Sequence, residues 1–144
     1  MSDRKGDYMN NENLHKEIDL IQNCIKRMAQ NSFIVKGWML SLITLVLSFG
    51  TASKFNEKSL SIVVLIPLIA FWFLDSFYLQ AEKKFRELYK WTIENRGKTN
   101  DFLYDLNPKR FDNRVPTIIK IMFSKTILPI YLSTILISFA LFVF

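Results

Sequence analysis

Residues 33–53 of the chain read FIVKGWMLSLITLVLSFGTAS, and this stretch decides the fold. Lys36 is the only charged residue in it. At a rise of about 1.5 Å per residue, a helix over this stretch is about 31 Å long, which is enough to cross the hydrocarbon core of a bilayer. The sequence therefore predicts a transmembrane helix over residues 33–53.

Two further apolar stretches predict two more transmembrane helices, over residues 59–79 and 126–144. Only a short polar connection separates residues 59–79 from the first span, so these two spans should form an antiparallel hairpin. Pro67 lies near the middle of the second span and should kink it. The fold class that follows is an all-α membrane protein with three transmembrane helices.

The segments outside the spans are polar, and four elements are expected in them. Residues 1–11 should be a disordered tail, and residues 12–31 an amphipathic cytosolic helix. Residues 80–115 should form a cytosolic helix that continues the second span, followed by an ordered connector, since a run of helix formers ends at Gly97. Residues 116–125 should form a helix in the membrane interface, because their apolar residues share one side.

An apolar seam marks one face of the helix that is expected over residues 12–31. Its members are spaced four, three, four and three residues apart, as in a heptad repeat. Two partners for the seam are open: the second cytosolic helix of the same chain, or other copies of the chain in a helical oligomer. The seam consists of Leu14, Ile18, Ile21, Ile25 and Met28.

The distribution of basic residues predicts the orientation of the chain in the membrane. Five Lys or Arg residues precede the first span and eleven lie in residues 83–125, whereas the connection between the first two spans holds only Lys54 and Lys58. By the positive-inside rule, the N-terminus and the long connection are cytosolic and the C-terminus faces outward. The first apolar stretch lies behind a polar segment, so it is expected to be a retained anchor and not a cleaved leader.

Two ionisable residues stand inside the predicted spans, Lys36 in the first and Asp75 in the second. Charged groups are costly in lipid and are therefore candidates for a functional site. Both lie about one turn from the cytosolic ends of their spans, so the hairpin should place them at a similar depth. We predict an ion pair between them, within one subunit or between neighbours. The alternative is that each side chain reaches separately to the interface.

The first span also carries a face of small residues at helical spacing. Small residues let helix backbones approach closely in lipid, so this face is predicted to pack against another helix, of the same chain or of another copy. Three aromatic residues, Trp38, Trp72 and Tyr78, are expected to anchor the spans at the membrane interface. The small residues are Gly37, Ser41, Thr44 and Ser48.

The remaining residues offer little for catalysis or metal binding. Cys24 is the only cysteine and His15 is the only histidine, so a metal site built from several such ligands is not expected. No phosphate-binding loop or nucleophile motif is visible. The net charge is +6, and the basic residues flank apolar stretches. These residues are therefore expected to interact with anionic membrane lipids and not with nucleic acid. We therefore expect no enzymatic activity, no metal and no cofactor.

A series of short motifs runs through residues 14–107. They are HKEIDLIQ (15–22), IKRM (25–28), NSF (31–33), KGW (36–38) and FWFLDSFYL (71–79), followed by Glu82, Phe85, Arg86, Leu88 and Tyr89. Together these motifs resemble the RipA family of small bacterial cytoplasmic-membrane proteins, which are described as octameric. The third span carries little of the resemblance.

The resemblance implies a homo-octamer in the bacterial inner membrane, with a role in envelope function, host adaptation or intracellular proliferation. It supplies no reaction and no catalytic residue. The positions that match recurring residues of the family are Asn31, Lys36, Gly37, Trp38, Asp75, Tyr78, Arg86 and Tyr89.

The predicted spans, the lack of catalytic motifs and the resemblance bear on three functions. The favoured one is a non-enzymatic membrane protein whose helices assemble into a homo-oligomer. The alternative is an oligomeric pore or channel, which needs a polar lining that the spans scarcely provide. An enzyme of lipid or envelope metabolism is the third, and the residues for its chemistry are missing.

Overall fold

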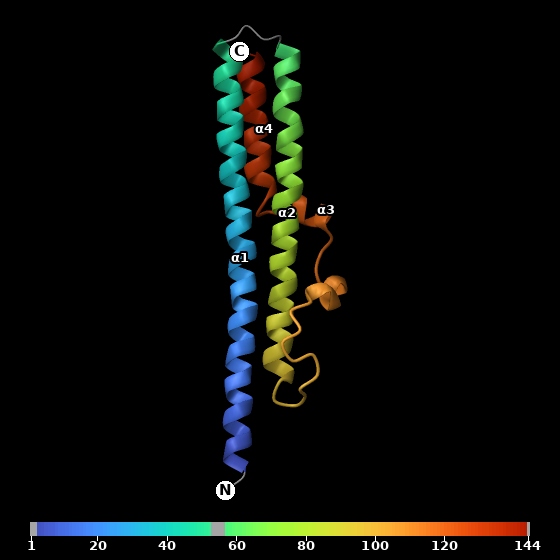
Figure 1. Cartoon of the computed structure of the whole chain (residues 1–144). Coiled ribbons are helices and arrows are strands. Elements are labelled where there is room, and N and C mark those ends of the chain that lie inside the picture. The colour runs from blue at the N-terminus through green and yellow to red at the C-terminus, as the bar shows by residue number, and fades with distance from the viewer. Residues whose placement is uncertain (1–2, 53–56, 144) are drawn as a thin grey trace.

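The computed structural model describes the backbone of residues 3–52 and 57–143 and the side chains of residues 11–50 and 62–139. Every regular element in these ranges is a helix. Two long helices, α1 (Asp3–Ala52) and α2 (Glu57–Asn95), lie side by side and run in opposite directions (Figure 1). Residues 53–56, in the predicted connection between them, lie outside the described residues.

α1 is a single helix of 50 residues, which corrects two predicted boundaries. Residues 3–11 are helical, so the prediction of a disordered tail is wrong there, and residues 12–31 and 33–52 form one helix and not two. The first proline of the chain is Pro67, so no proline interrupts the backbone hydrogen bonds of α1. Adding a residue to an existing helix costs far less than nucleating a new one, which favours a continuous rod.

α2 likewise joins the predicted second span to the helix that follows it. It has 39 residues and continues across Pro67 to Asn95. α1 and α2 therefore share a polar end, where the chain begins and α2 finishes, and an apolar end, where the two helices are connected. These two names are kept below.

The chain after α2 folds back along this helix towards the apolar end. A 3₁₀ helix, η1 (Pro108–Arg114), is followed by the short α3 (Ile118–Met122) and by α4 (Leu128–Val143). The helix predicted over residues 116–125 is thus shorter than expected, because it starts only after Pro116 and Thr117 and ends at Phe123. α4 has 16 residues, and residue 144, the last of the predicted third span, lies outside the described residues.

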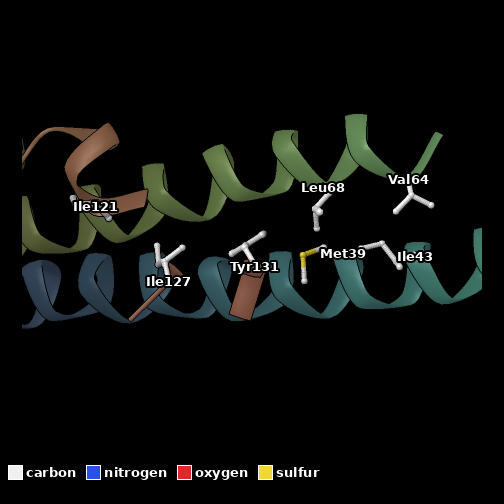
Figure 2. Packing of buried hydrophobic residues seen from close by; sticks show 7 residues of the cluster. All are labelled: Met39, Ile43, Val64, Leu68, Ile121, Ile127 and Tyr131. Atoms are coloured by element: carbon white, nitrogen blue, oxygen red, sulfur yellow. The ribbon is translucent and has the colours of Figure 1, made fainter. Parts of the chain in front are cut away.

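One hydrophobic cluster holds the apolar end together (Figure 2). It draws residues from α1, α2, α3, the turn before α4, and α4, and it is the main reason that the C-terminal part of the chain packs on the hairpin. Its buried members are Met39, Ile43, Val64, Leu68, Ile121, Ile127 and Tyr131.

A second cluster lies at the polar end, where Ile21 of α1 packs against Phe85 and Leu88 of α2 and Phe111 of η1. The side chains of Ile21 and Leu88 are almost fully buried. This cluster fixes the polar halves of α1 and α2 to each other.

Most of the apolar surface at the apolar end is left uncovered. Among the described residues, α1 and α2 each contain a segment long and apolar enough to cross a membrane, and only 22% of the most apolar window of each is buried. The core helix of a soluble protein is mostly buried instead. The exposed residues include Phe33, Trp38, Phe49, Ile62, Ile66 and Phe73.

Candidate functional site

The two ionisable residues of the apolar stretches meet at the centre of the hairpin. The Lys36 ammonium lies 2.7 Å from Oδ1 of Asp75. Ser32 completes the group: its hydroxyl donates to the same Asp75 oxygen at 2.5 Å and accepts a hydrogen bond from Lys36 at 2.8 Å. The structure therefore brings Lys36 and Asp75 together within one chain and adds a serine that the sequence reasoning did not include.

The periodicity of the two helices explains why these residues face each other. Ser32 and Lys36 are one turn apart on α1, on the side that also buries Val35 and Met39. Asp75 lies seven residues after Leu68 on α2, so it replaces an apolar residue in the stripe that faces α1.

Asp75 is fully buried, whereas the Lys36 side chain keeps 22% of its surface exposed. Oδ1 of Asp75 takes both hydrogen bonds, and Oδ2 is buried without a hydrogen-bond partner. The hydroxyl of Tyr131, on α4, donates to the Phe71 carbonyl at 3.2 Å and interacts electrostatically with Asp75. Three helices thus surround a carboxylate whose charge Lys36 compensates.

Trp72 joins three elements next to this pair. Its indole N–H donates to the carbonyl of Met122 at 3.1 Å, and its ring stacks on Tyr131 with 5.7 Å between centroids. Its ring also contacts Phe123 edge-on at 5.4 Å. Of the three predicted interfacial aromatics, Trp72 therefore packs α3 and α4 onto α2, Trp38 is exposed, and Tyr78 contacts the neighbouring Phe77.

The small-residue face of α1 does not contact α2. All four of its residues are exposed, and a Cβ atom added to Gly37 would meet nothing within 4 Å. α1 packs on α2 through a different face, which carries Val35, Met39 and Ile43. The small residues that point away from the hairpin are Gly37, Ser41, Thr44 and Ser48.

The apolar seam of the polar end, by contrast, lies against α2. Ile21 is buried in the second cluster, and Ile25 and Met28 pack against it. Leu14 and Ile18, nearer the N-terminus, are half-buried. The sequence left two partners open for the seam, and in the structure the seam packs on α2, the second long helix of the same chain.

A second buried ion pair, which the sequence reasoning missed, closes the polar end. Arg96, just beyond α2, donates through Nε to Glu17 Oε2 at 2.6 Å and through Nη2 to Glu17 Oε1 at 2.5 Å. Both side chains are at most 2% exposed. This two-bond geometry is the strongest form of an arginine–carboxylate contact.

The same arginine organises the loop after α2. Its Nη1 donates to the carbonyls of Thr99 and Asp101, and the backbone N–H of Tyr104 donates to Glu17. Phe102 and Tyr104 have φ angles of 59° and 61°, in the left-handed region that residues other than glycine seldom adopt. The Arg96 and Glu17 bonds hold this loop in its unusual conformation.

The sequence does contain a signal for this pair. Glu17 lies four residues before Ile21 and three after Leu14, on the apolar seam itself. A carboxylate on a buried face needs a cationic partner. Arg96 gives no such signal, because a basic residue is ordinary at the end of a helix and 79 residues separate it from Glu17.

An exposed pair on α1 shows the opposite situation. The Lys16 ammonium donates to Glu12 at 2.6 Å, one turn away. This hydrogen bond lowers the pKa of Glu12 below its ordinary value and raises the pKa of Lys16. Both groups are open to solvent, so salt screens the interaction, and we assign it no structural role.

No family model, characterised protein or solved structure matches the chain. The part of the chain with described side chains brings together no group of three or more His, Cys, Asp or Glu residues that could hold a metal ion. What the Ser32–Lys36–Asp75 group does chemically is to neutralise two charges inside an apolar bundle and to fix the register of α1 against α2.

Proposed function

We propose that this chain is a bacterial inner-membrane protein that crosses the bilayer three times and assembles into a homo-oligomer without catalysing a reaction. The main support is the large apolar surface that α1 and α2 leave exposed at one end of the hairpin. Water would meet this surface in a soluble monomer, whereas lipid tails and neighbouring helices cover it in a membrane.

α4 is the third span in this proposal. Its 16 helical residues are about 24 Å long, slightly less than the hydrocarbon core, so the turn before α4 has to contribute to the crossing. In Figure 1 it rises beside α1 and α2 at the apolar end. It carries no charged residue, which fits a lipid environment.

The orientation follows from charge. The polar halves of α1 and α2 and the η1 segment lie at the same end of the molecule, and they hold most of the basic residues (Figure 1). By the positive-inside rule this end is cytosolic and the C-terminus faces the outside.

The observation that carries the assembly is the outward-facing small-residue surface of α1, formed by Gly37, Ser41, Thr44 and Ser48. A surface of this kind lets the backbone of a second helix approach closely in lipid. The resemblance to the RipA family supports eight copies and a role in envelope function, host adaptation or intracellular growth. The matched position Gly37 belongs to this surface.

Cysteine cross-linking tests the assembly. In a Cys24→Ser background, Gly37→Cys should form cross-linked copies in native membranes, because Gly37 faces a neighbour. Met39→Cys is the matched control and should not, since Met39 is fully buried against α2. The mass of the complex in lipid nanodiscs should be a multiple of 17.0 kDa, with eight copies expected. A mass of one copy with no cross-link contradicts the proposal.

The alternative is a pore through the oligomer. The hydroxyl of Thr44 donates to the Leu40 carbonyl, and that of Ser48 donates to the Thr44 carbonyl, so both satisfy their own helix and present little polarity to a channel. Leakage of ions from liposomes that contain the purified protein would favour the pore, and tight liposomes at all voltages would favour the assembly protein.

A further inference from the structure

An open groove of about 460 Å³ lies between α2 and the η1–α3 segment. One wall is a face of α2 that carries Phe73, Gln80 and Lys84, and the other wall comes from residues 112–119. The amide of Gln80 donates to the Pro116 carbonyl at 2.9 Å and joins the two walls. The groove is separate from the Lys36–Asp75 site and from the outward face of α1.

The groove changes character along the axis of α2. Phe73, which is half exposed, lies at its apolar end, and Lys84 lies eleven residues further along, about 16 Å away. The opposite wall contributes Ile118 and Ile119, and Ile119 is 69% exposed. An occupant therefore needs a polar head and an apolar tail, joined over a distance similar to that from a phospholipid phosphate into its acyl chains.

The charge around the polar end of the groove selects the head. Residues 109–125 carry five basic side chains and one acidic side chain, a surplus of four positive charges. The ammonium of Lys84 lies 2.8 Å from Asp112, and the Thr117 hydroxyl lines the groove without capping α3. The Lys84 side chain is 18% exposed and that of Asp112 is 53% exposed. Water can therefore solvate the Asp112 carboxylate when Lys84 binds another anion.

We propose that this groove binds one anionic phospholipid. Its phosphate lies against Lys84 and Thr117, and one acyl chain follows Phe73 and Ile119 into the bilayer. This inference rests on the proposed membrane location, which puts Phe73 in the hydrocarbon region and Lys84 at the cytosolic surface. Basic pockets at this depth are typical sites for anionic headgroups.

Native mass spectrometry of the detergent-solubilised full chain tests the proposal, with phosphatidylglycerol and phosphatidylcholine as probes of equal chain length. The unchanged protein should bind one phosphatidylglycerol at least tenfold more tightly than phosphatidylcholine. Lys84→Gln should abolish this preference, and Lys84→Arg should keep it, since arginine retains the charge and the contact with Asp112. Lys83→Gln removes a charge from the neighbouring residue, which does not line the groove, and should keep the preference.

Equal affinity of the unchanged protein for the two lipids overturns the proposal. It is also overturned if Lys83→Gln weakens binding as much as Lys84→Gln, because the attraction would then come from surface charge in general. Cross-linking of Ile119→Cys to a second copy, with no lipid retained, assigns the groove to a neighbouring chain instead.

A separate fractionation distinguishes this failure from a failure of the proposed function. If the chain stays in alkali-washed membranes but shows no lipid preference, only the proposal that the groove binds an anionic phospholipid is wrong. If the chain leaves the membrane on washing, the membrane location itself is wrong.

Discussion

Two buried carboxylates hold the hairpin together, Asp75 at its centre and Glu17 at its polar end, and each is compensated by one cation. Asp75 receives a lysine and a serine, and leaves one oxygen without a hydrogen bond. Glu17 receives two bonds from one arginine and a third from a backbone N–H. The arrangement around Glu17 gives more of the buried polar atoms a hydrogen-bond partner. Its loss should therefore lower the free energy of unfolding more than the loss of the Asp75 arrangement.

Charge exchange tests the Lys36–Asp75 pair at the centre of the hairpin. Lys36→Asp and Asp75→Lys should each lower the free energy of unfolding by about 1–3 kcal/mol, because each leaves a like-charged pair where a charged hydrogen bond stood. The double exchange should recover at least half of the loss. Thermal unfolding of the purified protein in detergent measures all three variants. A double variant no more stable than the single variants excludes direct pairing.

Removal of Arg96 tests the pair at the polar end. Arg96→Ala should lower the free energy of unfolding by about 3–5 kcal/mol, since it strands a buried carboxylate. Lys16→Ala is the control: Lys16 pairs with Glu12, and the two side chains are 61% and 66% exposed, so its loss should leave the free energy of unfolding almost unchanged. Chemical denaturation followed by circular dichroism compares the two variants. Equal losses would mean that the Glu17–Arg96 contact contributes no more than a surface pair.

At the scale of elements, the structure joins what the composition divides. Asn31 and Ser32 mark a sharp change from polar to apolar sequence, and this change wrongly predicts a boundary between two helices. The polarity of the side chains reflects the environment of a segment. The continuity of a helix depends instead on its backbone hydrogen bonds, which form in both polar and apolar segments. Only a proline or a competing cap would have ended α1 there.

Spin labels measure this continuity. Labels at the exposed positions Leu20 and Leu40, with Cys24 replaced by serine, should lie about 30 Å apart along a single straight helix. The distribution should be narrow in lipid nanodiscs when labelled chains are diluted with unlabelled ones. A broad distribution centred well below 30 Å would indicate a hinge near Ser32.

At the scale of the whole molecule, the second cluster and the Glu17–Arg96 pair force the polar half of α1 and the segment after α2 onto the same side of any membrane. Single cysteines at Lys16 and Glu94 should therefore share their accessibility. In intact spheroplasts, a membrane-impermeant maleimide should label neither, and it should label both after lysis. Labelling of only one of them before lysis would contradict this fold.

The sequence predicted the parts of the architecture that depend on local composition. The apolar stretches, the antiparallel hairpin and the approach of Lys36 to Asp75 follow from length, spacing and the rarity of charge in such stretches. The Ser32 contact and the Glu17–Arg96 pair were missed, because serine and glutamate are ordinary in polar segments. The packing of Trp72 against α3 and α4 was missed too, since it depends on where the chain returns after 50 residues.

The unbroken length of α1 has a mechanical consequence. From Lys36 to Asp3 the helix extends about 50 Å, so a change in tilt of about 10° around Lys36 displaces the far end by about 9 Å. Bilayer thickness influences the tilt of membrane helices. If the chain spans a membrane as proposed, a thinner or thicker bilayer therefore moves the far end of α1 by several ångströms.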